Sequence, residues 1–332
     1  MAKGIISGSG TNEEPYLIED HEDFNALRSI PNTDGVYGTA EEPIYIELVN
    51  DIEFDTENPT NFETIGGTWY VVLDGKNKKL RNVYFVGNGE WALFETINGT
   101  VKDLHIKDLY VMTAGVISGL CINLFVSEES YNYNVLNNIR IDGYLASTGL
   151  NSAIYGISHY AYGRGRIEKC LINVEVGSNV YIFYGLCYLK GTTTGKALVI
   201  NGCKCVSKVN VTNSFYGIAE SYDGLDSQDN LLIYNCEVAC DIYLSGTGNV
   251  YGIAGYAYVH SSYSRNRIMQ VKSETDLPTV YGTCASNRYN STFDLDVLDY
   301  LGVGIVARDA DNGSSTEQLK SVDYLKAKGW CF

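Results

Sequence analysis

The sequence predicts an all-β protein folded as a parallel β-helix, a solenoid with coils of about 30 residues and a short helical cap at each end. A Tyr-Gly step between apolar residues recurs along the middle of the chain, with spacings of 29, 32, 35 and 30 residues, at Tyr155, Tyr184, Tyr216, Tyr251 and Tyr281. A fixed period of this length is typical of a solenoid. Between the steps lie short alternating segments, such as 166–176, 198–211 and 231–244, without the spacing of helical faces. Strands that recur once per period stack in parallel on their counterparts in the next period.

Composition agrees with strands separated by turns. The 332 residues include 34 Gly and 27 Tyr but only 5 Pro, so long stretches of backbone donors are free to pair in ladders. We expect the glycine of each Tyr-Gly step at a corner, where a side chain would collide with the neighbouring coil. A sandwich remains an alternative because Asn-Gly, a hairpin dipeptide, occurs at 88–89, 98–99, 201–202 and 312–313.

The two ends of the chain differ from the repeating middle and are expected to cap it. Residues 1–40 read as an N-terminal cap, with a strand over Tyr16–Ile18 and a short helix capped by Asp20. The apolar stripe of that helix comprises Phe24, Leu27 and Ile30. Residues 41–310 form the β-helix. Residues 311–332 form the C-terminal cap, with a helix begun by Ser315 or Thr316 and apolar positions at Leu319, Val322, Tyr324 and Leu325.

Charge and hydropathy exclude several classes of protein. The net charge of -16 argues against nucleic-acid binding, which needs a basic face. No run of 18 apolar residues exists and the first residues lack an apolar signal core, so we expect neither membrane insertion nor Sec export.

The nine cysteines are expected to be free thiols buried as small hydrophobes, as in a reducing compartment. No CxxC pair occurs and the four histidines are scattered, so no metal and no cofactor are predicted. Cys203 and Cys205, two positions apart in a strand, are expected on opposite faces.

Several segments carry a resemblance to a known family: 10–18, 23–28, 45–54, 62–66 and 73–83, together with the ending at 316–332. They resemble single-stranded right-handed parallel β-helix proteins of Firmicutes phages and prophages, and bacterial surface proteins with GLUG-type repeats. The chain departs from the family where Leu93-Phe94-Glu95 replaces the usual Gly-Leu-Phe-Gly. The family has no shared catalytic residues that could be carried over.

The resemblance implies a non-enzymatic virion structural protein, made in the host cytoplasm and released by lysis. It would be a tail fibre, tailspike or appendage adhesin for host-surface glycan, or a capsid or neck decoration protein. Its expected partners are other virion proteins and host polysaccharide, with a homotrimer suggested by analogy. Two alternatives stay open: a polysaccharide-degrading tailspike enzyme, either hydrolase or lyase, and a bacterial surface β-helix adhesin.

Acidic residues are the candidates for that enzymatic alternative, because glycoside hydrolysis needs two carboxyl groups about 5–9.5 Å apart. Weak candidates in the segment 219–230 are Glu220, Asp223, Asp226 and Asp229, and a second set is Asp294, Asp296 and Asp299. A solvated acidic loop is the favoured interpretation of the first set. Calcium binding by its aspartates is disfavoured because their spacing differs from that of an EF-hand loop.

Tyrosines that follow the Tyr-Gly steps are the candidate ligand or interface residues: Tyr160, Tyr162, Tyr222, Tyr256, Tyr258 and Tyr289. Tyr160 and Tyr162 follow Tyr155 by the same offsets at which Tyr256 and Tyr258 follow Tyr251, so we expect them in one ladder on one face. An exposed ladder of tyrosines would suit sugar rings or a protein partner. A partly buried structural stack is the alternative.

Overall fold

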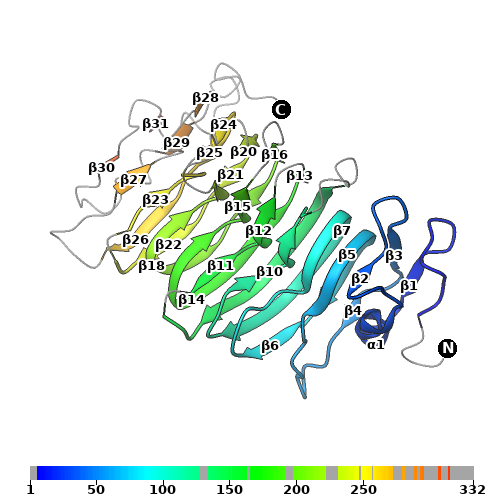
Figure 1. Ribbon diagram of the computed structural model, residues 1–332. Coiled ribbons are helices and arrows are strands. Elements are labelled where there is room, and N and C mark those ends of the chain that lie inside the picture. Colours follow the sequence, from blue (N-terminus) through cyan, green and yellow to red (C-terminus); the bar gives the residue numbers. More distant parts are fainter. Residues whose placement is uncertain are drawn as a thin grey trace.

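The protein is a parallel β-solenoid of about 7 turns of roughly 31 residues, with very little helix. In the computed structural model, strands of successive coils lie side by side from the N-terminal helix to the other end of the solenoid (Figure 1). The structure describes residues 6–126, 134–150, 152–162, 165–191, 197–221, 231–246, 248–255 and 257–271, and five short strands between Thr279 and Ser314.

The strands form columns, and every strand pairing described between coils is parallel. One column contains β1 (Tyr16–Ile18), β3 (Ile44–Leu48), β5 (Ile65–Arg81), β7 (Phe94–Thr113), β10 (Val135–Ser147), β13 (Gly165–Glu168), β16 (Leu198–Asn201), β20 (Leu231–Tyr234), β24 (Tyr258–His260) and β28 (Arg288–Tyr289). Beyond the next corner, later parts of β5, β7 and β10 pair in a second column with β4 (Ile52–Glu53), β14 (Leu171–Tyr184), β17 (Lys204–Cys205), β21 (Glu237–Val238), β25 (Tyr263–Ser264), β29 (Thr292–Asp294) and β31 (Gly313–Ser314).

The remaining strands complete each coil. The second column continues into β6 (Tyr84–Gly87), β18 (Lys208–Tyr216), β22 (Asp241–Leu244) and β26 (Arg267–Val271). The column that carries the Tyr-Gly steps contains β8 (Ile117–Ser118), β11 (Ala153–Tyr155), β23 (Val250–Tyr251), β27 (Thr279–Tyr281) and β30 (Val306–Ala307). The last column contains β2 (Val36–Tyr37), β9 (Cys121–Leu124), β12 (Ser158–Tyr162), β15 (Cys187–Gly191) and β19 (Ala219–Ser221).

One corner of the solenoid is built from a left-handed residue in each of seven coils. These residues have φ between +47° and +65° and occupy equivalent places between paired strands: Asn77, Asp103, Asn138, Lys169, Gly202, Asn235 and Ser261. Asn, Asp and Gly tolerate this conformation best, which explains why they supply five of the seven. The corner redirects the chain from one column to the next without a helix.

The Tyr-Gly corner confirms the expected role of glycine. A Cβ on Gly185 would lie 1.9 Å from the carbonyl oxygen of Gly217 in the next coil, and a Cβ on Gly156 would meet Gly185 in the same way. Only a residue without a side chain allows the backbones of stacked coils to approach this closely.

The N-terminal cap has the predicted elements. Helix α1 (His21–Ala26) follows β1 and is extended by a 3-10 turn, η1 (Leu27–Ser29). The Asp20 carboxylate accepts hydrogen bonds from the amides of Glu22 and Asp23, at 2.9 and 3.0 Å. Phe24, Leu27 and Ile30 are buried, so the stripe covers the end of the core. The predicted C-terminal cap lies outside the described residues, apart from β31. No described helix is long and apolar enough to span a membrane.

The solenoid interior holds seven of the cysteines, all buried free thiols. The prediction that Cys203 and Cys205 point to opposite faces is wrong, since both are buried. Residues two positions apart in a strand point to the same face, so the alternation of side chains itself places Cys203 and Cys205 together in the interior.

Candidate functional site

The tyrosines of the Tyr-Gly steps form a continuous stack along the solenoid. Ring centroids of Tyr155, Tyr184, Tyr216 and Tyr251 are separated by 4.6, 4.8 and 4.8 Å, and successive planes differ by 3°, 4° and 8°. Burial raises the pKa of Tyr155, Tyr184 and Tyr216. This stack is therefore part of the structural interior.

The prediction that Tyr160 and Tyr258 lie in one ladder is wrong. Tyr160 lies in β12 and pairs with Tyr188 of β15, whereas Tyr258 lies in β24 and pairs with Leu232 of β20. These are different columns. The reason is the length of the segment that joins the Tyr-Gly step to the first column. Through Leu232 and Val199 the register counterpart of Tyr258 is Arg166, which follows Tyr155 by eleven residues, whereas Tyr258 follows Tyr251 by only seven.

Other predicted tyrosines are placed only in part. Tyr162 pairs with Gly191 beside Tyr160, and Tyr289 pairs with His260 in the column of Tyr258. Tyr222 and Tyr256 lie outside the described residues. Whether any of these tyrosines contacts a ligand stays a prediction.

A mixed aromatic and charged surface surrounds Tyr160, and we call it the corner face. It comprises Glu90, His159, Tyr160, Tyr188, Lys190 and Glu220. The His159 ring lies against Tyr160 with centroids 3.7 Å apart, and its Nδ1 is 2.5 Å from the Glu90 carboxylate. The Lys190 ammonium lies 3.9 Å from the Tyr160 ring centroid, in cation–π geometry. These contacts fix the orientation of the Tyr160 ring.

Glu220 joins the corner face from β19, where its register partner is Tyr188. It is 5% exposed, so the interpretation of this residue as part of a solvated loop is wrong. The Ser221 amide donates to Glu220 Oε1 at 3.0 Å, and the carboxylate lies over Gly255, where a Cβ would be 1.7 Å from Oε2. After burial, the Glu220 charge is a further cause that raises the pKa of Tyr184 and Tyr216.

The other acidic candidates cannot be placed beside Glu220. Asp223, Asp226, Asp229, Asp296 and Asp299 lie outside the described residues, and Asp294 is described only as part of β29. Among the residues that the structure does describe, no group of three or more His, Cys, Asp and Glu could hold a metal ion.

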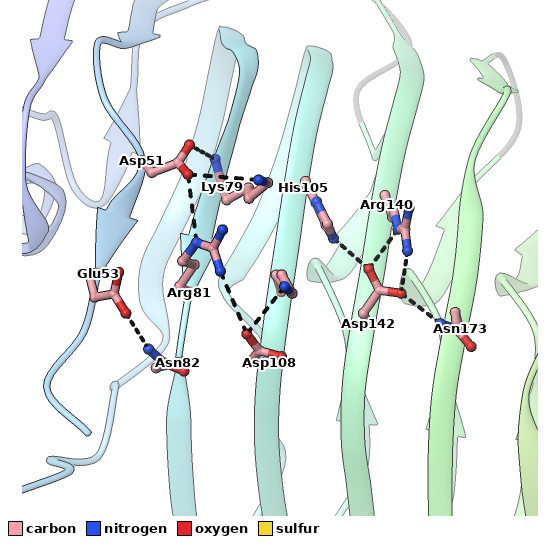
Figure 2. Close-up of polar contacts among 11 residues, drawn as sticks. Asp51, Glu53, Lys79, Arg81, Asn82, His105, Asp108, Arg140, Asp142 and Asn173 are labelled. Atoms are coloured by element: carbon pink, nitrogen blue, oxygen red, sulfur yellow. Dashed lines mark hydrogen bonds and ion pairs between the residues drawn. The ribbon is translucent and has the colours of Figure 1, made fainter. Parts of the chain in front are cut away.

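A second polar cluster, on the outer face of β7, β10 and β14, was missed by sequence reasoning (Figure 2). Asp142 accepts from Arg140 Nε and Nη2 at 2.6 and 3.0 Å and from Asn173 Nδ2 at 2.8 Å, and it lies 2.5 Å from His105 Nε2. Burial alone would raise the pKa of Asp142, but these partners lower it overall. A carboxylate so fully engaged ties three coils together and has little capacity for acid–base chemistry. The coil period, 35 residues from His105 to Arg140 and 31 residues from Asp142 to Asn173, is the signal that could have found it.

The same outer face carries a row of half-buried tyrosines. Tyr84, Tyr110 and Tyr144 stack with centroids 5.3 and 5.4 Å apart. The row ends at Glu175, the register partner of Tyr144.

Comparison with known proteins supports the fold alone. No family model matches this sequence, and no curated protein sequence matches it. Among solved structures, the chain is similar to a crystal structure of a "putative immunoglobulin A1 protease" from Bacteroides ovatus, with 14% identity and a TM-score of 0.52. The match covers 96% of this chain and 89% of that one. At this identity the likeness establishes a shared solenoid architecture.

Proposed function

We propose that this chain is a non-enzymatic adhesin that binds a cell-surface glycan through its corner face. The observation that carries the proposal is the pairing of Tyr160 with Tyr188, two half-buried rings from adjacent coils with centroids 6.4 Å apart. Around them stand a cation, Lys190, and the His159–Glu90 pair.

This arrangement supplies the two kinds of contact that a sugar needs. Tyrosine offers an apolar ring edge together with a hydroxyl group, and charged side chains nearby accept or donate hydrogen bonds to sugar hydroxyls. Because Lys190 already covers the Tyr160 ring, the sugar would contact the ammonium and the ring edges rather than stack on that ring. The preformed contacts reduce the ordering needed on binding.

Binding to an array of purified Firmicutes surface polysaccharides tests the proposal. We expect Tyr160→Ala and Tyr188→Ala to weaken binding about tenfold or more, since about 1.4 kcal/mol corresponds to tenfold. Tyr110→Ala is the matched control, because Tyr110 is a half-buried stacked tyrosine in another column. The proposal fails if the chain binds no polysaccharide, or if the corner-face variants bind as well as the control.

The resemblance of the sequence supports a place for this adhesin in a phage virion, with other virion proteins as partners. Mass spectrometry of purified particles and immunogold labelling test this second step. Tail-tip labelling agrees with an adhesin, capsid or collar labelling favours a decoration protein, and absence from particles favours a bacterial surface protein.

Burial of Glu220 among tyrosines favours one alternative, cleavage of the bound polysaccharide. Enzymes use carboxyl groups in apolar surroundings as general acids. Release of reducing ends or unsaturated products by the wild-type chain, abolished in Glu220→Gln, would replace the adhesin by an enzyme. Unchanged polysaccharide length after prolonged incubation is the result expected of an adhesin.

A further inference from the structure

A row of four charged residues, one per coil, continues the row of Tyr84, Tyr110 and Tyr144 on the outer face. Glu175, Lys208, Asp241 and Arg267 occupy equivalent positions in β14, β18, β22 and β26, one residue per coil. Their signs alternate. Glu175 pairs with Lys208 at 3.0 Å, and Asp241 pairs with Arg267 at 2.6 Å through both carboxylate oxygens.

A second row lies beside the first, four residues earlier in each coil. Its successive members are Leu171, Lys204, Glu237 and Tyr263, again in strict register. Lys204 and Glu237 form an ion pair at 2.6 Å. The charges of Glu175, Lys204, Lys208, Glu237, Asp241 and Arg267 sum to zero, and we call these six residues the charge patch. Beside them, Arg265 also contacts Glu237, at 3.8 Å, and its side chain is more than half exposed.

The alternating pattern of the charge patch is self-complementary. When a second copy with the opposite axis direction faces the first row, Glu175 lies opposite Arg267 of that copy. Lys208 then lies opposite its Asp241. The same arrangement places Lys204 opposite Glu237 and Leu171 opposite Tyr263 in the second row. Every contact between members of these two rows is therefore between opposite charges or between two largely apolar side chains.

We propose that the charge patch is an interface between two copies of this chain with antiparallel solenoid axes. The twofold axis runs parallel to the strands and passes between the coils of Lys208 and Asp241. Such an interface uses the same surface on both copies, as closed dimers require. Equal coil spacing in the two copies keeps all four levels of charge in register.

Formation of this dimer does not break the existing ion pairs. Each charge keeps its neighbour of opposite sign within its own row and gains another across the interface. Lys208, Lys204, Glu175 and Arg267 have side chains that are more than half exposed, so they can reach a partner. A parallel arrangement would instead place each charge against its own copy, which is unfavourable.

The distribution of the remaining charge favours the same orientation. Residues 1–63 hold 15 acidic and 2 basic residues, which is -13 of the net charge of -16. The described part of this acidic segment, residues 6–63, lies at the N-terminal end of the solenoid (Figure 1), several coils from the charge patch. Antiparallel axes keep the two acidic ends apart, whereas parallel axes would bring them together.

Sedimentation velocity of the full chain tests the interface. At about 0.1 M salt the Debye length is about 10 Å, so distant repulsion is screened while contacts across the patch persist, and we expect dimers. At about 1 M salt the Debye length falls to about 3 Å, and the dissociation constant should rise about tenfold or more.

Charge reversal makes the test specific. Lys208→Glu places two like-charge contacts in the dimer, and Asp241→Lys does the same, so each variant alone should be monomeric. An equimolar mixture should recover dimers, because Glu at 208 of one chain then faces Lys at 241 of the other. Lys107→Glu changes the charge equally on β7, outside the patch, and should dimerise like the wild type.

Recovery in the mixture also shows that both variants are folded. A monomeric wild type at about 0.1 M salt, a trimer, a dimer indifferent to the reversals, or a mixture that stays monomeric would each overturn the interface. The inference is independent of glycan binding, which uses a different column of strands.

Discussion

Tyr184 and Tyr216 stack across neighbouring coils, with ring centroids 4.8 Å apart and planes that differ by 4°. Tyr184 is buried, so its ring has the role of a core residue rather than of a ligand platform. Tyr184→Ala should lower the free energy of unfolding by about 3–5 kcal/mol, as truncation of other buried aromatic residues does. Tyr184→Phe keeps the ring and should cost about 1 kcal/mol. Urea unfolding of both variants checks this, and equal losses would contradict a stacking role.

The glycine beside each stacked tyrosine gives a second prediction. Gly185→Ala would place a methyl group 1.9 Å from a backbone oxygen of the next coil, which cannot move without disturbing the strand. Gly202→Ala is the matched control, because Gly202 has φ of +65° but no atom nearer than 3.9 Å. The control should cost about 1–2 kcal/mol for its left-handed backbone, and Gly185→Ala should cost more. Thermal unfolding of the two variants side by side shows whether steric collision or the left-handed backbone conformation causes the larger loss of stability.

Local signals in the sequence were sufficient for the fold and for the N-terminal cap. The Tyr-Gly period sets the coil, and Asp20 before Phe24 and Leu27 defines a short helix. The helix depends on residues close together in the chain, and the coil period depends on a short motif whose recurrence is directly visible. The left-handed corner was also visible in principle, since Asn138 and Gly202 lie two coils apart and Gly202 and Asn235 one coil apart.

The lateral position of a side chain was harder to predict. Tyr258 and Tyr162 have the same offset from their Tyr-Gly steps, yet a shorter segment between Tyr251 and the first column places Tyr258 in the next column. Asp142 was overlooked because two of its partners, Asn173 and His105, are 31 and 37 residues away in sequence. Counting from the nearest corner, rather than from one motif per coil, would have aligned these residues.

The Asp142 cluster predicts a dependence of stability on pH. Its partners lower the pKa of Asp142 in the folded chain despite burial. A lowered folded pKa means that the stabilisation is present above the unfolded value of about 3.9 and is lost as pH falls towards the folded value. Asp142→Asn should therefore destabilise the chain near neutral pH, with the difference from wild type shrinking below about pH 4. Urea unfolding across this range provides the measurement. A difference that stays constant with pH would show that the charge of Asp142 contributes nothing.

The buried thiols give a prediction about reactivity. Burial raises the pKa of Cys121 to about 12 and also raises that of Cys187. The thiolate is the reactive form, and an ordinary cysteine has a pKa of about 8.5. At about pH 8 the native chain should therefore leave Cys121 and Cys187 unmodified by iodoacetamide, whereas urea should expose both.

Peptide mass spectrometry reads out each site separately. Leu150→Cys supplies an internal reference, because Leu150 is 94% exposed and a thiol there should react at once. Modification of Cys121 at a rate close to that of the reference would mean that the coils open readily at β9. Protection of Cys121 until global unfolding would show that the stacked coils exclude solvent as one unit, as a continuous dry core requires.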